Sequence, residues 1–476
     1  MADVVAIPKK GGSAFRPISL LLSLSKVFEK ILSDHVTHFL DSNKLYSDSQ
    51  FGFRRQWSTE MQLLQMCHQF SEVVLERKEA DVIFLDCTMA SDRLPHDVIG
   101  TSRQKHGVDE HLLALFSDYL KGRSKRVMVD GFFSEEITVK SGVPQGSILG
   151  PTFFTVAVNN LSEAVQSRVL QYGDDIVLYR KVSGEEDCPA LQEDLNNLAK
   201  WCSEVGLEIN PQKSQHLRIS NKNRKTAIPA GSYSFNAVVI PTEAEAECLG
   251  VTISSRMDWA GQVDKVEAKC RNRLYSIKAF LPRRFGMVEQ LLFKSLVRSV
   301  MDYASSSWHT TGKGLQKKLE NIQKKFLQSI RLGCLESSEK HYAYIAQYQQ
   351  HLGETGWHPL WQRRLDGILL NTYKIWKGMV AGGDLIMKRE MPGRTTRSQF
   401  KDFLLSPVSF APASCKLLDS ITASFAYVAA EILKDPLFSP SPGQLLTLGA
   451  FKNYLLNFKF SNLKWCKDFI DSLLVV

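Results

Sequence analysis

The sequence lacks several features that would place it in a well-defined special class. No apolar run among its 476 residues approaches the roughly 18–20 residues that cross a bilayer, so we expect no membrane partner. The first residues, MADVVAIPKKGG, do not have the basic-then-apolar layout of a secretory signal. We find no internal repeat and no low-complexity tract. With 44% hydrophobic and 23% charged residues, the composition is instead that of an ordinary globular protein.

The nine cysteines are scattered and form no CxxC pair, and no histidines stand at finger-like spacing from them. This arrangement argues against a zinc module and against a disulfide framework. It favours a reducing, intracellular compartment. Whether that compartment is the nucleus or the cytoplasm stays open, because the basic segment NKNRK at 221–225 fits a solvated loop better than an import signal.

Positive charge is concentrated in one part of the chain. Residues 261–330 contain 14 Lys and Arg against 5 Asp and Glu, whereas the formal net charge of the whole sequence is +9. The remainder is therefore close to neutral. A local basic segment on a balanced protein indicates a polyanionic partner, although a solvated helix face is the alternative.

The first part of the chain reads as a mixture of strands and helices. An apolar run at 80–86 predicts a strand buried on both faces, and Asp130-Gly131 predicts a hairpin turn. Two amphipathic helices are predicted, one with apolar positions Val27, Ile31, Val36 and Leu40, the other with Leu191, Leu195, Leu198 and Cys202. A further helix begins at the N-cap Asp109 and ends at Gly122.

From about residue 260 the pattern becomes helical. Residues 288–303 and 314–332 are predicted as amphipathic helices. In the second, lysines lie on a different face from the apolar positions; they are Lys317, Lys318, Lys324 and Lys325. Beyond residue 340 the signal weakens. The fold class is therefore α+β, followed by helices.

Three aspartates follow or separate apolar strand-like runs. Asp86 ends one run, and Asp174 and Asp175 stand at a bend between two others. If neighbouring strands align these positions, three carboxylates meet at one sheet edge, where the repulsion between them is costly unless cations neutralise it. Oxygen-only ligation suits Mg²⁺, and a pair of such ions can activate a hydroxyl and stabilise a leaving pyrophosphate. A solvated turn is the alternative.

The ordered segments around these aspartates resemble a known family. Asp86, then SGVPQGSILGP, YGDD, GLEINPQKS and LGV, is similar to the motif series of reverse transcriptases. The segments FRPISLL, QFGFR and IQKKFLQSIRLG resemble the non-LTR retrotransposon (LINE) enzymes, particularly jockey-like ones. The resemblance implies a right-hand polymerase. Fingers and a palm with an antiparallel sheet would occupy 1–255, a basic helical thumb 256–345, and a helical region of unknown role 346–476.

The resemblance also implies roles for individual residues. Asp86, Asp174 and Asp175 would hold two Mg²⁺ ions, or Mn²⁺, with the Cys87 carbonyl as an extra ligand. Lys213 would protonate the leaving pyrophosphate. Incoming deoxynucleotides would meet Lys9, Arg16, Ser91, Gln145 and Gly146. Arg54 and the lysines at 317, 318, 324 and 325 would contact the RNA template and the DNA primer.

The chain departs from the family pattern in two ways. Where the family usually reads Asp-x-x-Lys-Ala-Phe-Asp, this chain reads DCTMASD, so Met89 replaces a basic residue and Ser91 replaces the aromatic that excludes a 2′-hydroxyl. We expect weaker discrimination against ribonucleotides. The endonuclease domain of a complete element is also absent from this sequence, which we interpret as a shortened copy.

Three functions are weighed on this basis. The first is RNA-directed DNA polymerisation. The second is a non-catalytic nucleic-acid-binding relic, supported by the altered residues 89–91. The third is RNA-dependent RNA polymerisation, which is supported only by the Gly-Asp-Asp segment and by the small side chain of Ser91.

Overall fold

A computed structural model describes residues 2–8, 15–99, 109–222, 231–281, 286–310, 312–331, 342–380 and, further on, 428–429, 432–433, 437–438, 440–441, 443–445, 447–458, 460 and 463. The chain divides into two compact units. The first comprises Met1–Thr59, Glu79–Arg218 and Asn223–Ala244, and the second Glu60–Lys78, Ile219–Lys222 and Glu245–Val476. Among the described residues, no helix is both long and apolar enough to cross a membrane.

The centre of the first unit is a five-stranded sheet of order β12-β9-β3-β8-β7. Its strands are β12 (Thr242–Glu243), β9 (Gln215–Ile219), β3 (Glu79–Asp86), β8 (Asp175–Val182) and β7 (Arg168–Tyr172). β3 pairs antiparallel with β8, and β8 antiparallel with β7, whereas β12 joins β9 in parallel. The predicted antiparallel sheet is thus confirmed for β3, β8 and β7.

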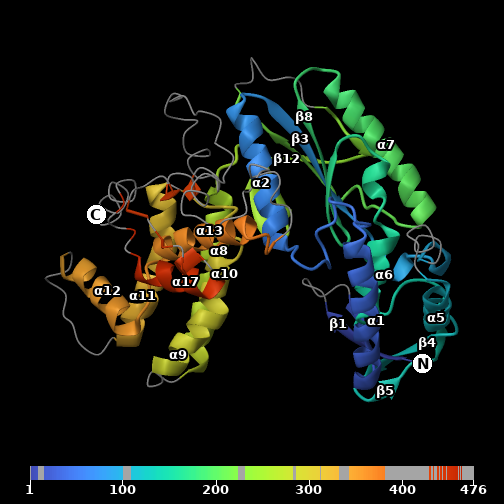
Figure 1. The fold of residues 1–476 in the computed structure, drawn as a ribbon, viewed down its shortest axis with the longest axis horizontal. Coiled ribbons are helices and arrows are strands. Elements are labelled where there is room, and N and C mark those ends of the chain that lie inside the picture. The colour runs from blue at the N-terminus through green and yellow to red at the C-terminus, as the bar shows by residue number, and fades with distance from the viewer. Residues whose placement is uncertain are drawn as a thin grey trace. The chain divides into compact units, whose positions relative to one another are not determined.

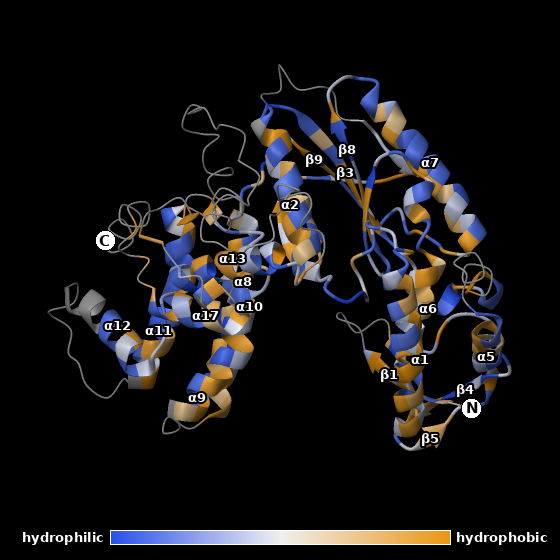
Figure 2. Ribbon diagram, viewed as in Figure 1, coloured by the Kyte–Doolittle hydropathy of each residue, from blue (hydrophilic) through white to orange (hydrophobic). Residues whose placement is uncertain are grey.

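Helices cover this sheet because their apolar stripes and the strands bury one another. α7 (Asp187–Val205) packs on β8, and the four predicted apolar positions of α7 are all buried in the core that contains Ile83 and Leu178. Figure 2 shows both hydrophobic and hydrophilic residues along α7. Gly206 ends the helix with a φ of 76°, as its position in the sequence predicts.

A second sheet in this unit has the order β2-β1-β4-β5, with β6 also paired to β4. The strands are β1 (Ala2–Pro8), β2 (Phe15–Leu20), β4 (Ser124–Val129), β5 (Phe132–Phe133) and β6 (Ile137–Thr138). The β4–β5 turn is Asp130-Gly131, both with positive φ, as a two-residue hairpin requires.

Other helices of the first unit include α1 (Ser23–Ser42), α3 (Ala90–Arg93), α5 (Glu110–Leu120) and α6 (Leu149–Ala157). Asp109 caps α5 through its side chain, as predicted. On α1, Val36 and Leu40 are buried, but Val27 and Ile31 are exposed in the described structure. Periodicity identified the apolar face correctly but not how much of it is covered.

Two small antiparallel ribbons complete the strands. β10 (Ser234–Phe235) and β11 (Val238–Val239) lie in the first unit; β13 (Glu245–Cys248) and β14 (Val251–Ser254) begin the second. The other elements of the second unit, within the described residues, are helices. Figure 1 labels its helices: α2 (Thr59–Leu75, all but its first residue), α8 (Ala260–Phe280), α9 (Gly286–Leu292), α10 (Ser299–Asp302), α11 (Lys313–Arg331), α12 (Tyr342–Thr355), α13 (Leu360–Trp376) and α17 (Leu448–Asn457).

The predicted helix at 288–303 is interrupted. A π-helical segment, Phe293–Arg298, stands between α9 and α10. Arg273 on α8 donates to the carbonyl of Leu296 within this segment, which satisfies a group that widened helical geometry leaves less well paired. Amphipathic periodicity alone does not distinguish such a segment from an α-helix.

A buried carboxylate joins two helices of the second unit. Glu320 on α11 accepts hydrogen bonds from the backbone N–H of Leu360 (3.1 Å) and of Trp361 (3.3 Å) at the start of α13. These are among the N–H groups that a helix leaves unsatisfied at its N-terminus. The side chain of Glu320 therefore fixes α13 on α11.

Candidate active site

The strand register brings the three predicted aspartates to one end of the central sheet. Asp86, the last residue of β3, is the direct Cα partner of Asp175, the first residue of β8. Residues opposite one another in an antiparallel pair lie about 4.5–5.5 Å apart. Asp174 precedes Asp175 in the turn, which Gly173 opens with a φ of 66°. Both turn aspartates are exposed.

The charges of these groups influence one another. The protein partly desolvates the Asp175 carboxylate, and Asp174 and Asp86 add negative charge, so the pKa of Asp175 is raised to about 6. Burial, with smaller contributions from Cys202 and the three aspartates, also raises the pKa of the Cys87 thiol. A cation at this edge would relieve the repulsion.

The donor chemistry fits a hard cation, since carboxylate and carbonyl oxygens are what Mg²⁺ and Mn²⁺ prefer. In the part of the chain that the structure describes, however, no three His, Cys, Asp or Glu side chains are gathered closely enough to hold an ion. The aspartates share a sheet edge without forming a closed coordination sphere. The identity and number of ions therefore belong to the proposal below.

The backbone of Cys87 is available for a further contact. Cys87 and Ile209 form an isolated antiparallel bridge in which the flanking groups make the hydrogen bonds: Thr88 N–H donates to Glu208 O, and Asn210 N–H to Asp86 O. In such a pair the central residue's own N–H and C=O point away from the partner strand. The Cys87 carbonyl thus points away from residues 208–210.

Lys213 lies in a tight turn that is tied to Asp86. The N–H of Asp86 donates to Ser214 Oγ (3.2 Å), and Asn210 N–H donates to the carbonyl of Asp86 (2.8 Å). The Asn210 side chain accepts from the N–H of Lys213 (3.3 Å), which stabilises the turn. Lys213 is exposed, so its ammonium group is free to reorient. The turn therefore connects Lys213, the predicted general acid, to Asp86, one of the predicted metal-binding carboxylates.

Residues 49–53 support the turn that carries Asp174. Phe51 N–H donates to Gln171 O, and Gln171 N–H to Ser49 O, both at 2.8 Å. Gly52 lies so close that a Cβ there would come within 2.5 Å of the Gly173 nitrogen. Phe53 lies beside the ring of Tyr172, with 6.3 Å between the ring centroids. Position 52 therefore requires glycine, because any side chain there would collide with the backbone of the turn that carries Asp174.

Gln145 and Gly146 belong to a loop held between two other segments. The Gln145 carbonyl accepts from the N–H of Ser19 (2.8 Å), and its side-chain amide donates to Asp92 (2.9 Å). Gly146 has a φ of 103°, and a Cβ there would lie 2.9 Å from the Ser19 carbonyl. This close approach to Ser19 is one reason for a glycine at 146, and the predicted packing of Gly146 against a nascent base pair stays a prediction.

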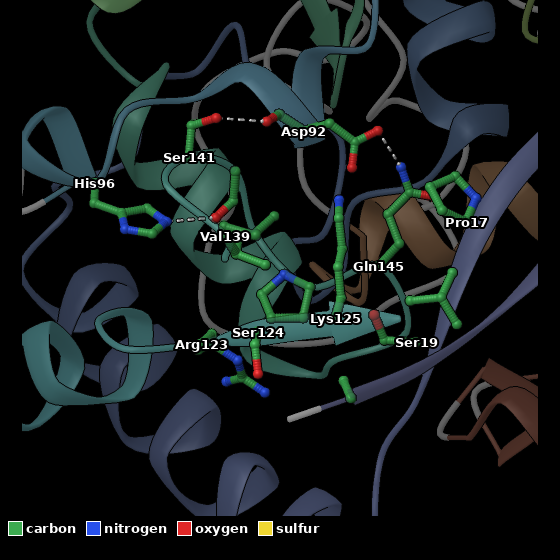
Figure 3. Close-up of a pocket in the computed structure, with 15 residues that line it drawn as sticks. Pro17, Ser19, Asp92, His96, Arg123, Ser124, Lys125, Val139, Ser141 and Gln145 are labelled. Carbon is green, nitrogen blue, oxygen red and sulfur yellow. Dashed lines mark hydrogen bonds between the residues drawn. The ribbon is translucent and has the colours of Figure 1, made fainter. Parts of the chain in front are cut away.

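A narrow pocket of about 40 Å³ lies beside this loop (Figure 3). Its wall includes Gln145 and Asp92, and Lys125 extends into it from β4. His96 pairs with the carbonyl of Gly142 (2.9 Å), and Ser141 donates to that of Asp92 (3.1 Å). The pocket is large enough for a water or a small ion, not for a nucleotide.

The two substitutions within the segment DCTMASD, Met89 and Ser91, lie two residues apart at the start of the short helix α3. Met89 is exposed and has a left-handed backbone, with a φ of 50°. Ser91, on the short helix α3, is half-buried, and its carbonyl accepts from the N–H of Val143 (2.8 Å). Residue 91 is therefore anchored to the segment that leads into Gln145.

The remaining first-unit predictions have different outcomes. Arg16 is exposed on β2. Lys9 falls outside the described residues. Arg54 is nearly buried, donating to the carbonyls of Ser47 (2.7 Å) and Gln50 (3.2 Å), and its guanidinium stacks on Trp57 at 4.4 Å. The structure thus supplies Arg54 with a structural role, and its contact with template phosphate stays a prediction.

The lysines predicted to contact nucleic acid are all on α11, in the second unit. Lys318 pairs with Asp264 (2.6 Å). The ammonium of Lys324 lies 5.2 Å from the ring centroid of Tyr348. Lys317 is half-buried and Lys325 exposed. Lys318 is exposed as well, and Lys325 differs from it in having no ion pair among the described residues.

Sequence reasoning missed several supporting side chains. Asp92 holds Gln145, and it could have been identified as the final aspartate of DCTMASD. Glu29 is buried in α1 and accepts from the N–H of Ile148 (2.7 Å), so it anchors the start of α6. Nothing in the local pattern distinguishes Glu29 from a solvent-facing glutamate.

Comparison with known proteins agrees with this geometry. Residues 7–253, just over half of the chain, match the family described as reverse transcriptase (RNA-dependent DNA polymerase). The chain belongs to this family. The α+β fold class, and the resemblance to non-LTR elements, are confirmed.

Two curated relatives are from Drosophila melanogaster. The probable RNA-directed DNA polymerase from transposon BS is 26% identical over 68% of this chain and 37% of that protein. The RNA-directed DNA polymerase from mobile element jockey is 27% identical over 69% of this chain and 37% of that protein. The chain thus spans little more than a third of these relatives' length.

Among solved structures, telomerase from Candida tropicalis in complex with a fragment of telomeric RNA aligns with all of this chain and 64% of that chain. The TM-score is 0.43 and the identity 12%. The RNA-dependent RNA polymerase of a human picobirnavirus aligns with 77% of this chain and 64% of that chain, with a TM-score of 0.42 and 10% identity. These likenesses are too distant to assign a substrate.

Proposed function

We propose that this chain is an RNA-directed DNA polymerase of a non-LTR retrotransposon, which adds deoxynucleotides to a DNA primer on an RNA template. The observation that carries the proposal is the register of Asp86 with Asp175, beside the exposed turn that contains Asp174. In the reaction, the primer 3′-oxygen forms a bond to the α-phosphorus of the nucleotide. The bond to the β-phosphate oxygen breaks, and pyrophosphate leaves.

Two Mg²⁺ ions, or Mn²⁺, would be held by Asp86, Asp174, Asp175 and the Cys87 carbonyl. When bound, they would lower the pKa of the primer hydroxyl and stabilise the pyrophosphate. The chain's own residues then position the reactants. Lys213 donates a proton to the leaving pyrophosphate, a role that its exposed, turn-mounted ammonium group supports.

The nucleotide would contact Lys9 and Arg16 through its phosphates, and Gln145, Gly146 and Ser91 near its base and sugar. The support for the last three is the network that ties Gln145 to Asp92 and Ser91 to Val143. The basic residues of 256–345, including Lys317, Lys318, Lys324 and Lys325, would form a thumb along the template–primer duplex. Phosphate contacts of this kind position a duplex without reading its sequence.

Primer extension on an RNA template tests the proposal. Wild type is compared with Asp174→Asn, which removes charge with little change in size, and with Asp118→Asn as a control, since Asp118 is exposed on α5. We expect extension by wild type and the control, and a loss of at least 100-fold in Asp174→Asn. Chelation of divalent metal should abolish extension in every variant.

The alternative function, a nucleic-acid-binding relic, is favoured by one specific observation: residues 89–91 depart from the family pattern while their fold is retained. A relic should bind the RNA template–DNA primer duplex in a salt-sensitive way. Wild type should then extend the primer in neither Mg²⁺ nor Mn²⁺. Failure to extend, with binding retained, would reject the polymerase and establish the relic.

A further inference from the structure

Three aromatic rings form a buried stack in the second unit. Phe293, the first residue of the π-helical segment, stacks on Phe326 of α11, with 4.1 Å between the ring centroids. The ring of Trp357 extends the stack, and its centroid lies 5.2 Å from that of Phe293 and 6.0 Å from that of Phe326. All three side chains are buried. Packing against two helical segments therefore fixes the position of the Trp357 ring.

Two cations of the π-helical segment lie against this ring. The ammonium nitrogen of Lys294 is 5.3 Å from the ring centroid of Trp357, and the guanidinium carbon of Arg298 is 5.7 Å from it. At such distances a cation is attracted by the ring. Lys294 and Arg298 are four residues apart, a spacing that makes side chains neighbours on a helix surface. Two positive charges are thus held in one small region.

Neither cation has a partner of opposite charge. Within the described residues, Lys294 and Arg298 form no hydrogen bond and no ion pair, and their nitrogen atoms keep accessible surface, unlike the buried Nε of Arg364. Burial and the charge of Arg363 lower the pKa of Arg298, although Asp302 opposes this effect. Like charges four residues apart destabilise a helix. An anion between the two side chains would relieve the repulsion.

Several other cations of the basic segment 261–330 are already neutralised. Lys265 forms an ion pair with Glu247. Arg271 forms one with Glu267 on the same helix, at 2.6 Å. The pair beside Trp357 differs because its two cations are unpaired, close together and half-buried against a fixed ring. Side chains positioned in this way lose little conformational freedom when they bind an anion.

We propose that Lys294 and Arg298 together bind one phosphate group in the backbone of the nucleic-acid duplex. The planar guanidinium of Arg298 can donate two parallel hydrogen bonds to phosphate oxygens, and the ammonium group of Lys294 acts as a point charge on the same anion. Such a contact positions a duplex without reading its sequence. This site rests on the proposed function in one respect, namely that the polyanion is the template–primer duplex.

Binding of a fluorescent RNA template–DNA primer duplex, measured by anisotropy in EDTA, tests the site. We expect Lys294→Gln and Arg298→Gln each to weaken binding at least fivefold, because each removes a charge-assisted contact. Since both cations serve one phosphate, the double variant should lose less than the product of the two single losses. The slope of log binding constant against log salt concentration should become shallower by about one in the double variant, rather than by about two.

Lys377→Gln is the matched control for these variants. Lys377 is half-buried and lies 4.3 Å from the ring centroid of Trp376, so its aromatic contact is of the same kind. Among the described residues, no second cation accompanies Lys377 at that ring. The control should therefore bind the duplex like wild type. Thermal unfolding of each variant verifies that it is folded.

Duplexes that carry a single neutral methylphosphonate linkage locate the phosphate. At one position, this linkage should weaken wild-type binding at least fivefold and leave binding by the double variant unchanged, because the cations for that phosphate are already gone. Single losses that multiply in the double variant, or the absence of any such position, would overturn the shared phosphate site. An equal loss in Lys377→Gln would overturn it as well.

The outcome of this test is separate from that of primer extension. The binding assay requires no catalysis, so failure of wild type to extend a primer would reject the polymerase and leave the phosphate site in place. Unchanged duplex binding in the Lys294 and Arg298 variants would remove the phosphate site and leave the extension result as it stands.

Discussion

Gly52 and Gly173 approach each other so closely that a Cβ on Gly52 would lie 2.5 Å from the Gly173 nitrogen and 3.0 Å from the Tyr172 carbonyl carbon. The two residues are far apart in sequence, yet the loop containing the first supports the turn that carries Asp174. Replacement of Gly52 must move backbone, because no flexible side chain is involved.

We therefore expect Gly52→Ala to reduce primer extension at least tenfold and to destabilise the fold by about 1–3 kcal/mol, the range typical of overpacking. Urea unfolding and extension assays measure the two effects. Gly353→Ala is the matched control, since a Cβ at Gly353 on α12 meets nothing within 4 Å. Unchanged extension in Gly52→Ala would show that the turn tolerates displacement.

The raised pKa of Asp175 predicts a pH dependence of stability. The carboxyl ionises near 3.8 in an ordinary environment and near pH 6 in the fold. Between these values the native state binds more protons than the unfolded state, so this group's contribution lowers stability as pH rises, and the loss is complete above about pH 6.

Asp175→Asn removes this titration. Its melting temperature relative to wild type should rise between pH 4 and pH 6 and then stay constant, as measured by thermal unfolding in matched buffers without metal. Asp118→Asn should show no such trend. A difference that does not vary with pH would exclude the proposed repulsion among the three carboxylates.

A buried polar cluster fixes β9 on β3 at the end opposite Asp86. Asp81 accepts from His216 (2.8 Å), Arg218 (2.7 Å) and Tyr233 (2.5 Å). Burial alone would raise the pKa of Asp81, but these donors outweigh it and hold the pKa far below its usual range. Asp81→Ala would remove the carboxylate that pairs most closely with the partly buried Arg218, whose other carboxylate neighbour, Glu79, lies 3.9 Å away.

Loss of one partner of such a pair costs about 3–5 kcal/mol. We expect Asp81→Ala to lower the free energy of unfolding by that amount in a urea titration at pH 7. Asp34→Ala, which breaks exposed ion pairs with Lys30 and Arg55, should cost far less than Asp81→Ala, because solvent screens exposed pairs. Equal costs would mean that burial adds nothing to the Asp81 cluster.

The polar residue Ser91 predicts relaxed sugar selectivity. A small side chain leaves room for a 2′-hydroxyl, so the preference of wild type for deoxynucleotides over ribonucleotides should be weak. Ser91→Phe should increase it at least tenfold. Competition between the two nucleotide types in primer extension measures the ratio, and a strong wild-type preference would contradict the steric argument.

Nucleic-acid binding should depend on salt through the lysines of α11. For duplex DNA, the logarithm of the binding constant falls linearly with the logarithm of the salt concentration. Each phosphate that a lysine neutralises makes the slope steeper by about 0.9. Lys325→Gln, at an exposed position with no ion pair among the described residues, should reduce the slope by about one, and Lys200→Gln should not. Filter binding across a salt series measures it, and an unchanged slope would remove Lys325 from the interface.

Much of the fold and part of the site could be predicted from the sequence, and the reasons are physical. The stripe of α7, the Asp109 cap and the Asp130-Gly131 turn are set by local chemistry, so the sequence specifies them nearly alone. The alignment of Asp86 with Asp175 needed strand register, which the buried runs around both residues determine. By contrast, Glu29 and Asp81 act through partners distant in sequence. Their burial depends on tertiary packing, which no local pattern reveals.

The π-helical segment has a consequence for how length changes are tolerated in this chain. A widened turn holds one residue more than the α-helical path it replaces, and each residue turns an α-helix by about 100°. Removal of a single residue between Phe293 and Val297 would let this turn close to regular α-helical geometry without rotating the stretches on either side of it. Phe293, Val297 and Met301, which are fully buried, could therefore keep their places. An α-helix elsewhere in the chain lacks such a widened turn, so the same deletion there would rotate one half of the helix against the other by about 100°.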